Sequence, residues 1–234
     1  MTDHKDEDAA KKPSAAGQAA RARAAQARAK AEFILSRAYG LLRHPKQEWE
    51  QIRDEQTNAA AIMAGYVAPL AAIAPIAGMI GQLAFRTPGV PVSSGILTGA
   101  IVSFLVLVAV IFFLGILTNA VARHFEATPD ELAALKLAAY APTPALILGV
   151  VSLVPSLWWI ALLGLPVTAY LIYRGLPVLM KCPEDRAQGY AATVLASGLA
   201  ALILLLALSS CFTGGERTVA DEAAIEAAKD AAKD

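Results

Sequence analysis

Three long stretches of the sequence contain almost no charged side chain, and this feature most limits what the chain can fold into. Only Arg86 is charged between residues 60 and 121, and no residue is charged in 137–173 or in 187–215. A helix needs about 20 apolar residues to cross a membrane. In water, such stretches would expose large apolar patches. They exclude a water-soluble globular protein and predict an all-α, multi-pass membrane helix bundle.

Turn residues divide these stretches into five predicted transmembrane helices. Proline and glycine follow Arg86, and Pro155 interrupts the second stretch near its middle, so we expect a tight hairpin there. The predicted spans are residues 60–84, 98–121, 137–154, 157–173 and 188–211. Six spans are the main alternative, if the region around Arg86 hides a re-entrant segment. Barrel strands are a poor fit because they alternate apolar with polar residues.

The positions of Lys and Arg predict the orientation. With the N-terminus inside, the first outer loop holds only Arg86, whereas the inner segments next to the spans hold Arg43, Lys46, Arg53, Arg123, Lys136, Arg174, Lys181 and Arg186. We therefore expect a cytoplasmic N-terminus and an external C-terminus. The first apolar stretch of sufficient length begins near residue 60, so we expect no cleavable signal peptide.

The segments outside the membrane fall into three predicted parts. Residues 1–30 are rich in Ala, Lys and Arg and predict a cytoplasmic arm that is disordered or a fraying helix. Residues 213–234 predict an acidic, Ala-rich external tail. Residues 31–59 predict short amphipathic helices that form an interfacial platform on the cytoplasmic leaflet. The platform residues are Phe33, Ile34, Leu41, Leu42, Trp49 and Ile52. The equally weighted alternative is that this apolar face packs against the inner ends of the bundle.

The sequence offers no pattern typical of an enzyme. We find no ionisable side chain in the interiors of the predicted spans and no zinc-protease or nucleophile-elbow motif. The three histidines are scattered along the chain, so we expect no catalytic residue, metal or cofactor. The formal net charge is zero, and no basic stripe predicts binding to nucleic acid. Cys182 and Cys211 are expected at opposite membrane surfaces, where no disulfide can join them.

Among the features of the sequence, the prolines within the spans are the best candidates for a functional site. Each proline removes a backbone donor and frees the carbonyl one turn earlier, and in lipid that carbonyl needs a new partner. The candidate kink cluster consists of Tyr66, Pro69, Pro75, Tyr140, Pro142, Thr143, Pro144, Pro166 and Tyr170. One interpretation is a hydrated cavity among spans one, three and four, and the favoured one is ordinary kinks satisfied by packing. Gly95 and Gly99 permit close helix approach, within the bundle or in a dimer.

Several motifs, taken in order, resemble bacterial members of the Yip family, whose eukaryotic relatives interact with Ypt/Rab GTPases. The matching residues are Leu41-Leu42-x-x-Pro45 with Trp49-x-x-Ile52, then Ala139-Tyr140-Ala141-Pro142-Thr143-Pro144, then Tyr170-x-x-Tyr173-Arg174-Gly175-Leu176, and Tyr190. The resemblance covers roughly residues 40–212. It implies a five-span membrane protein without known catalysis. Residues 54–58 do not match the Asp-Leu-Tyr-Gly-Pro motif of the eukaryotic relatives, so the resemblance does not by itself predict GTPase binding.

These observations lead to one functional hypothesis and two alternatives. We expect a non-enzymatic protein of the bacterial inner membrane that works as a scaffold, through contacts with membrane lipids or with an unidentified membrane or cytoplasmic protein. A homo-oligomer is one possible form of it. The first alternative is a small-solute or lipid transporter or channel that uses the proline-kinked cavity. The second is an accessory subunit of a larger membrane complex.

Overall fold

The computed structural model describes residues 15–85, 95–205 and 207 of the 234-residue chain. Within these residues there is no β-strand, and five helical segments are long and apolar enough to cross a membrane. This confirms the predicted all-α fold with five transmembrane helices. The chain forms two compact units, residues 1–43 and 44–234, which we describe separately.

The first unit contains a helix of 29 residues, α1 (Ala15–Arg43). Residues 15–30 of the predicted arm are therefore helical, which is the second of the two forms expected for them. Alanine and arginine are among the strongest helix formers, and a helix that is already nucleated adds such residues at little cost. Residues 1–14 of the predicted arm lie outside the described residues.

The second unit begins with the short helix α2 (Pro45–Asp54) and continues into the first span, Ala59–Ala84. Pro45 occupies the first turn of α2, where its missing N–H costs nothing. Asn58 starts the first span, because its side-chain oxygen accepts a hydrogen bond from the Ala61 amide at 2.8 Å.

Prolines divide the first span into short helical pieces. These are α3 (Ala59–Ile62), the π-helical turn η2 (Met63–Val67), α4 (Ala68–Ala71) and α5 (Ile73–Ala84). The π-helical turn ends two residues before Pro69, and the break between α4 and α5 lies three residues before Pro75. Both irregularities fall within one turn of a proline, where a backbone donor is missing.

The second span is the longest regular helix of this unit, α6 (Gly95–Val121), which tightens at its end into the 3₁₀ turn η3 (Ala122–Phe125). The third span contains α7 (Glu131–Tyr140), α8 (Thr143–Leu148) and the 3₁₀ turn η4 (Gly149–Leu153). It begins at Glu131 rather than at residue 137, because the Asp130 carboxylate accepts a hydrogen bond from the Ala133 amide at 2.9 Å and caps the helix.

The predicted hairpin between spans three and four is present. Val154 alone has extended backbone between η4 and the 3₁₀ helix η5 (Pro155–Leu163). The fourth span continues through α9 (Gly164–Leu179) rather than ending at residue 173. Arg174 does not stop it, because its side chain is exposed while Gly175 and Leu176 are buried in the bundle.

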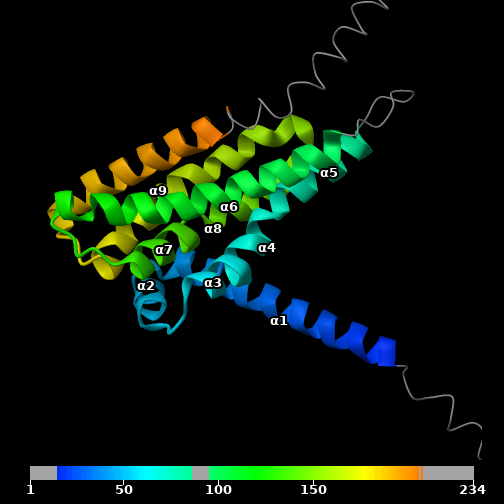
Figure 1. The fold of residues 1–234 in the computed structure, drawn as a ribbon, viewed down its shortest axis with the longest axis horizontal. Coiled ribbons are helices and arrows are strands. Elements are labelled where there is room, and N and C mark those ends of the chain that lie inside the picture. Colours follow the sequence, from blue (N-terminus) through cyan, green and yellow to red (C-terminus); the bar gives the residue numbers. More distant parts are fainter. Residues whose placement is uncertain (1–14, 86–94, 206, 208–234) are drawn as a thin grey trace, which may run out of the picture. The chain divides into compact units, whose positions relative to one another are not determined.

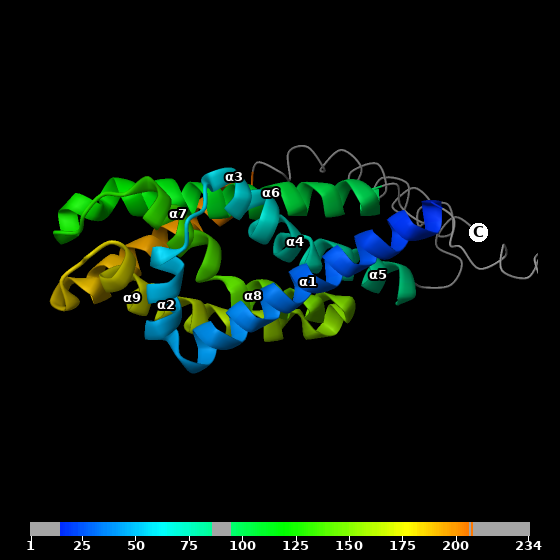
Figure 2. The same ribbon diagram turned by 90° about the horizontal axis from the view of Figure 1, so that it is seen from below.

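The fifth span is the helix Glu184–Leu205, and residues 206 and 208–211 of the predicted span lie outside the described residues. The long helices of this unit lie side by side (Figures 1 and 2). At Gly149, an added Cβ would come within 2.7 Å of Ala74 Cβ, so a larger residue would force α5 and η4 apart. Glycine therefore permits the close approach of spans one and three.

Candidate functional site

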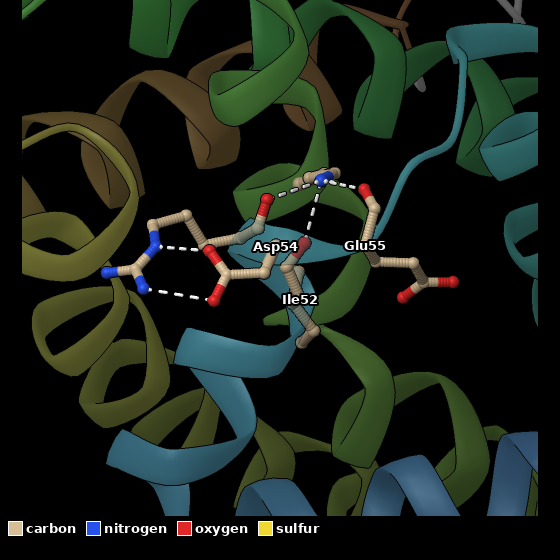
Figure 3. A network of polar contacts seen from close by, with 5 residues as sticks. Ile52, Asp54 and Glu55 are labelled. Atoms are coloured by element: carbon tan, nitrogen blue, oxygen red, sulfur yellow. Dashed lines mark hydrogen bonds and ion pairs between the residues drawn. The ribbon is translucent and has the colours of Figure 1, made fainter.

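A buried lysine joins the third span to the short helix that precedes the first. The Lys136 side chain is 4% exposed. Its Nζ donates hydrogen bonds to the carbonyl oxygens of Ile52 at 2.7 Å, Arg53 at 3.1 Å and Glu55 at 2.7 Å. Figure 3 shows the carbonyls of Ile52 and Glu55 turned toward this nitrogen.

The chemistry of the two partners explains this contact. The last carbonyls of a helix have no donor within the helix, and they form the negative end of its dipole. An ammonium group has three N–H donors and no acceptor, so Lys136 can satisfy all three carbonyls at the end of α2. The lysine thus fixes α2 to α7 through backbone atoms.

Sequence patterns alone do not reveal this residue. They place Lys136 in an inner loop and predict no ionisable side chain inside the spans, whereas Lys136 lies within α7 in the third span. The apolar run starts only at Leu137, but Asp130 is a typical helix-capping residue and could have moved the start of the span. The three carbonyl partners could not be found, because backbone groups leave no pattern in the sequence.

Next to this network, Arg53 and Asp54 form an exposed ion pair. Arg53 Nε lies 2.8 Å from Asp54 Oδ1, and Arg53 Nη2 donates to Asp54 Oδ2 at 3.1 Å. The hydrogen bond from Arg53 holds the pKa of Asp54 below its ordinary value. Both side chains are about half exposed or more, at 48% and 67%, so the pair contributes little to stability.

Two of the six residues of the predicted platform belong to α2, and both are buried. Trp49 and Ile52 have no exposed surface, and the Trp49 ring lies against Gly175 of α9. For these two residues, the structure shows the alternative interpretation, in which the apolar face packs against the bundle. The other four, Phe33, Ile34, Leu41 and Leu42, lie on α1 in the first unit, where Phe33 and Leu42 are largely exposed.

Three residues of the kink cluster meet between spans one and three. The Tyr66 hydroxyl lies 2.8 Å from Thr143 Oγ1, and the Tyr66 and Tyr140 rings are 4.4 Å apart. Thr143 Oγ1 donates its proton to the Tyr140 carbonyl at 2.6 Å, so Tyr66 is the donor in the first bond. Pro144 leaves that carbonyl without its helical donor, and the threonine hydroxyl replaces it.

The other members of the kink cluster differ from these three, and from one another, in how far they are buried. Pro75 and Pro144 are buried, and Pro69 and Pro142 are partly exposed. Pro166 and Tyr170 of span four are exposed, Tyr170 by 50%, on the outside of the bundle. The contacts among Tyr66, Tyr140 and Thr143 are direct, so these side chains fill the space that they share.

A second group of contacts joins the end of span two to the start of span five. The Tyr190 hydroxyl donates to the Thr118 carbonyl at 2.6 Å, and its ring stacks on Phe125 with centroids 4.9 Å apart. Cys182 Sγ lies 3.5 Å from the Phe125 carbonyl oxygen. Burial, together with the nearby carboxylates of Asp185 and Glu126, raises the pKa of the Cys182 thiol. This thiol is therefore a poor nucleophile.

Gly99 is one of the two predicted contact glycines. It does not mediate close helix approach within the described part of the chain, because the space that a Cβ would occupy is open. Gly95 starts α6. Close approach instead involves Gly115, where a Cβ would lie 3.2 Å from Leu135, and Gly175. The dimer interpretation of Gly95 and Gly99 stays a prediction. Across residues 15–85, 95–205 and 207, no cluster of His, Cys, Asp and Glu is placed to hold a metal ion.

These features define a multi-pass membrane helix bundle with a short helix anchored to its third span. The pattern of the Yip1 domain family matches residues 39–205, and the chain belongs to this family. It is 29% identical over 189 residues to the inner membrane protein YohC of Escherichia coli strain K12, an alignment that covers 77% of this chain and 97% of that protein. The protein of the same name from E. coli O6:H1 strain CFT073 matches equally well. No solved structure matches the chain.

Proposed function

We propose that this chain is a non-enzymatic protein of a bacterial inner membrane that organises other proteins through its cytoplasmic face. The name of the E. coli relatives supports the inner membrane. The distribution of Lys and Arg supports a cytoplasmic N-terminus and a periplasmic C-terminus. In this orientation α2, the loop at residues 126–130 and the loop at residues 180–183 face the cytoplasm.

The anchoring of α2 by Lys136 is the observation that best supports a contact surface. Three hydrogen bonds from a buried ammonium and the packing of Trp49 against Gly175 fix this helix to two different spans, α7 and α9. Surfaces that bind partners gain affinity when they are ordered before binding, because less conformational entropy is lost. A short polar helix held this firmly is suited to present side chains to a partner.

The outer face of α2 supplies the polar groups for such a contact. Lys46, Gln47 and Gln51 are exposed, and Gln47 and Gln51 are one turn apart on the same side of the helix. Trp49 and Ile52 hold the opposite side in the bundle. The proposed partner is therefore a cytoplasmic protein, or the cytoplasmic part of a membrane protein, that binds a polar helix face.

Affinity purification from native membranes in mild detergent tests this proposal. A variant with Lys46→Ala, Gln47→Ala and Gln51→Ala should lose a partner that the wild-type protein retains. The control carries Lys229→Ala and Lys233→Ala in the C-terminal tail, on the opposite side in the proposed orientation, and should retain it. If the helix variant keeps the same partners as the control, α2 is not the contact surface. A partner present in a fixed stoichiometry would favour the accessory-subunit form of the proposal.

A flux assay tests the competing transporter interpretation. The direct contacts among Tyr66, Tyr140 and Thr143 favour packing over a hydrated path. We therefore expect vesicles with the wild-type protein to conduct no more solute than vesicles without it. Saturable flux that disappears in the variant with Tyr140→Phe and Pro144→Ala would overturn the scaffold proposal.

A further inference from the structure

A pocket opens beside α6 and α7, and its lining includes no residue of the Lys136 network or of the kink cluster. It has a volume of about 440 Å³ and is lined by Ala59, Phe112, Gly115, Ile116, Asn119, Glu131, Leu132 and Leu135. This volume lies within the range of ligand sites in proteins, about 300–1,000 Å³. The lining is mostly apolar, with an amide and a carboxylate as its polar side chains.

The pocket runs from the end of the bundle that faces the cytoplasm in the proposed orientation toward the middle of the spans. Asn119 lies near the end of α6, and Glu131 and Ala59 are the first residues of α7 and α3. Phe112 is seven residues before Asn119, so it lies about 10 Å deeper along the helix. Phe112 and Ile116 are 44% and 48% exposed on a helix that spans the membrane. The apolar end of the pocket therefore borders lipid, and its polar end lies near the headgroups.

The polar end offers two side-chain hydrogen-bond acceptors, and one of them is buried. Asn119 Oδ1 is buried and has no hydrogen-bond partner in the described part of the protein. An unsatisfied buried acceptor costs free energy, which a ligand with a donor would recover. Glu131 is the only charged residue among the described residues that line the pocket, and an ionised carboxylate only accepts hydrogen bonds.

We propose that this pocket binds a phospholipid with a primary ammonium headgroup, such as phosphatidylethanolamine, from the cytoplasmic leaflet. The ammonium donates hydrogen bonds to the Glu131 carboxylate and to Asn119 Oδ1, and an acyl chain follows Phe112 and Ile116. A trimethylammonium headgroup has no N–H to donate. An anionic headgroup without an ammonium is repelled by Glu131. This proposal does not depend on the proposed contact surface of α2.

The test is the composition of lipid retained by the full-length protein. The protein is reconstituted in nanodiscs that contain equal amounts of phosphatidylethanolamine, phosphatidylcholine and phosphatidylglycerol with identical acyl chains. It is then extracted in mild detergent, and native mass spectrometry identifies the lipids that stay bound. We expect phosphatidylethanolamine to be enriched over the other two by roughly threefold to tenfold, the effect of one net hydrogen bond.

Matched variants connect the retained lipid to this pocket. Glu131→Gln removes the charge and Asn119→Leu removes the acceptor, and each should bring the retained lipid close to the bulk composition. Glu184→Gln is the control, because Glu184 is exposed and, like Glu131, is the first residue of a membrane-spanning helix. Thermal unfolding of each variant in detergent should stay near that of the wild type, which separates lost binding from lost fold.

Two outcomes would overturn the proposal. The first is equal retention of the three lipids, or enrichment of phosphatidylcholine or phosphatidylglycerol, by the wild-type protein. The second is phosphatidylethanolamine enrichment that Glu131→Gln and Asn119→Leu reduce no more than Glu184→Gln does.

Discussion

At the scale of single residues, Lys136 shows how one charge can be stable inside a membrane bundle. A lone ammonium in lipid is costly. Here the cost is offset because the group donates hydrogen bonds to three backbone carbonyls at the end of α2. The carbonyls stabilise the buried ammonium, and the ammonium donates hydrogen bonds to the end of α2.

Lys136→Met should destabilise the protein. The substitution keeps a long side chain but removes the ammonium that donates to the carbonyls at the end of α2, which should cost about 1.5–3 kcal/mol of unfolding free energy. Thermal unfolding in detergent measures the loss, and amide hydrogen exchange should become faster in α2. Lys46→Met, on the exposed face of the same helix, is the control. Equal unfolding temperatures for the two variants would contradict the role given to Lys136.

Cys182 should react slowly with thiol reagents near neutral pH. Only the thiolate is the nucleophile, and burial with neighbouring carboxylates raises the pKa of this thiol, so less thiolate is present at a given pH. The rate of alkylation should climb at a higher pH than for an exposed cysteine.

The measurement uses a Cys211→Ser background, so that Cys182 is the only cysteine. The reference is Glu184→Cys with Cys182→Ala in the same background, because residue 184 is exposed and close in sequence. A pH profile for Cys182 that coincides with the reference profile would show that its pKa is not raised.

At the scale of helices, small residues decide how closely the elements approach. A Cβ at Gly175 would lie 2.5 Å from Leu137 Cδ1 and 2.9 Å from the Trp49 ring, both of them buried side chains. Gly99 faces open space instead. The two glycines look alike in the sequence, and only their surroundings separate them.

Gly175→Ala should therefore destabilise the protein, while Gly99→Ala should not. Overpacking in a filled core costs about 1–3 kcal/mol, whereas alanine in an open helical position gains helix propensity. Thermal unfolding of the two variants in the same detergent gives the comparison. A fall in the unfolding temperature of Gly99→Ala as large as that of Gly175→Ala would contradict the packing at α2 and α9.

Leu107→Arg should block stable insertion of the second span. Residue 107 lies near the middle of α6, and a charge there costs at least about 2.5–3.5 kcal/mol. The amount of protein in the membrane fraction measures the effect, with Thr98→Arg near the end of the helix as the milder control. A normal yield of the Leu107→Arg protein would show that the span is placed wrongly.

At the scale of the whole molecule, an odd number of spans predicts that the two termini lie on opposite sides of the membrane. We expect a reporter enzyme fused to the N-terminus to be active only in the cytoplasm, and one fused to the C-terminus only outside it. Fusions in the loops at residues 126–130 and 180–183 should behave like the N-terminal fusion. Both termini in the same compartment would contradict the count of five spans.

The sequence alone was enough to predict that lipid surrounds most of the chain and that the chain crosses the membrane five times. Charge-free length is a property of the chain itself, so five spans, the hairpin at Pro155 and membership of the family could be predicted before any contact was known. The same reasoning predicted that Pro144 frees the Tyr140 carbonyl. The predicted ends of the spans were less accurate, because Asp130 caps a helix that starts before the apolar run of the third span.

Only the tertiary structure decided which residues meet. Trp49 and Ile52 could have faced lipid or protein by their helical pattern, and the close fit with Gly175 made them part of the bundle. Lys136 is a charge directly before an apolar run in the sequence, and its partners are backbone oxygens more than 80 residues away. The length of an apolar segment follows directly from the types of its side chains. Hydrogen bonds to the backbone instead depend on which helix ends come together in space.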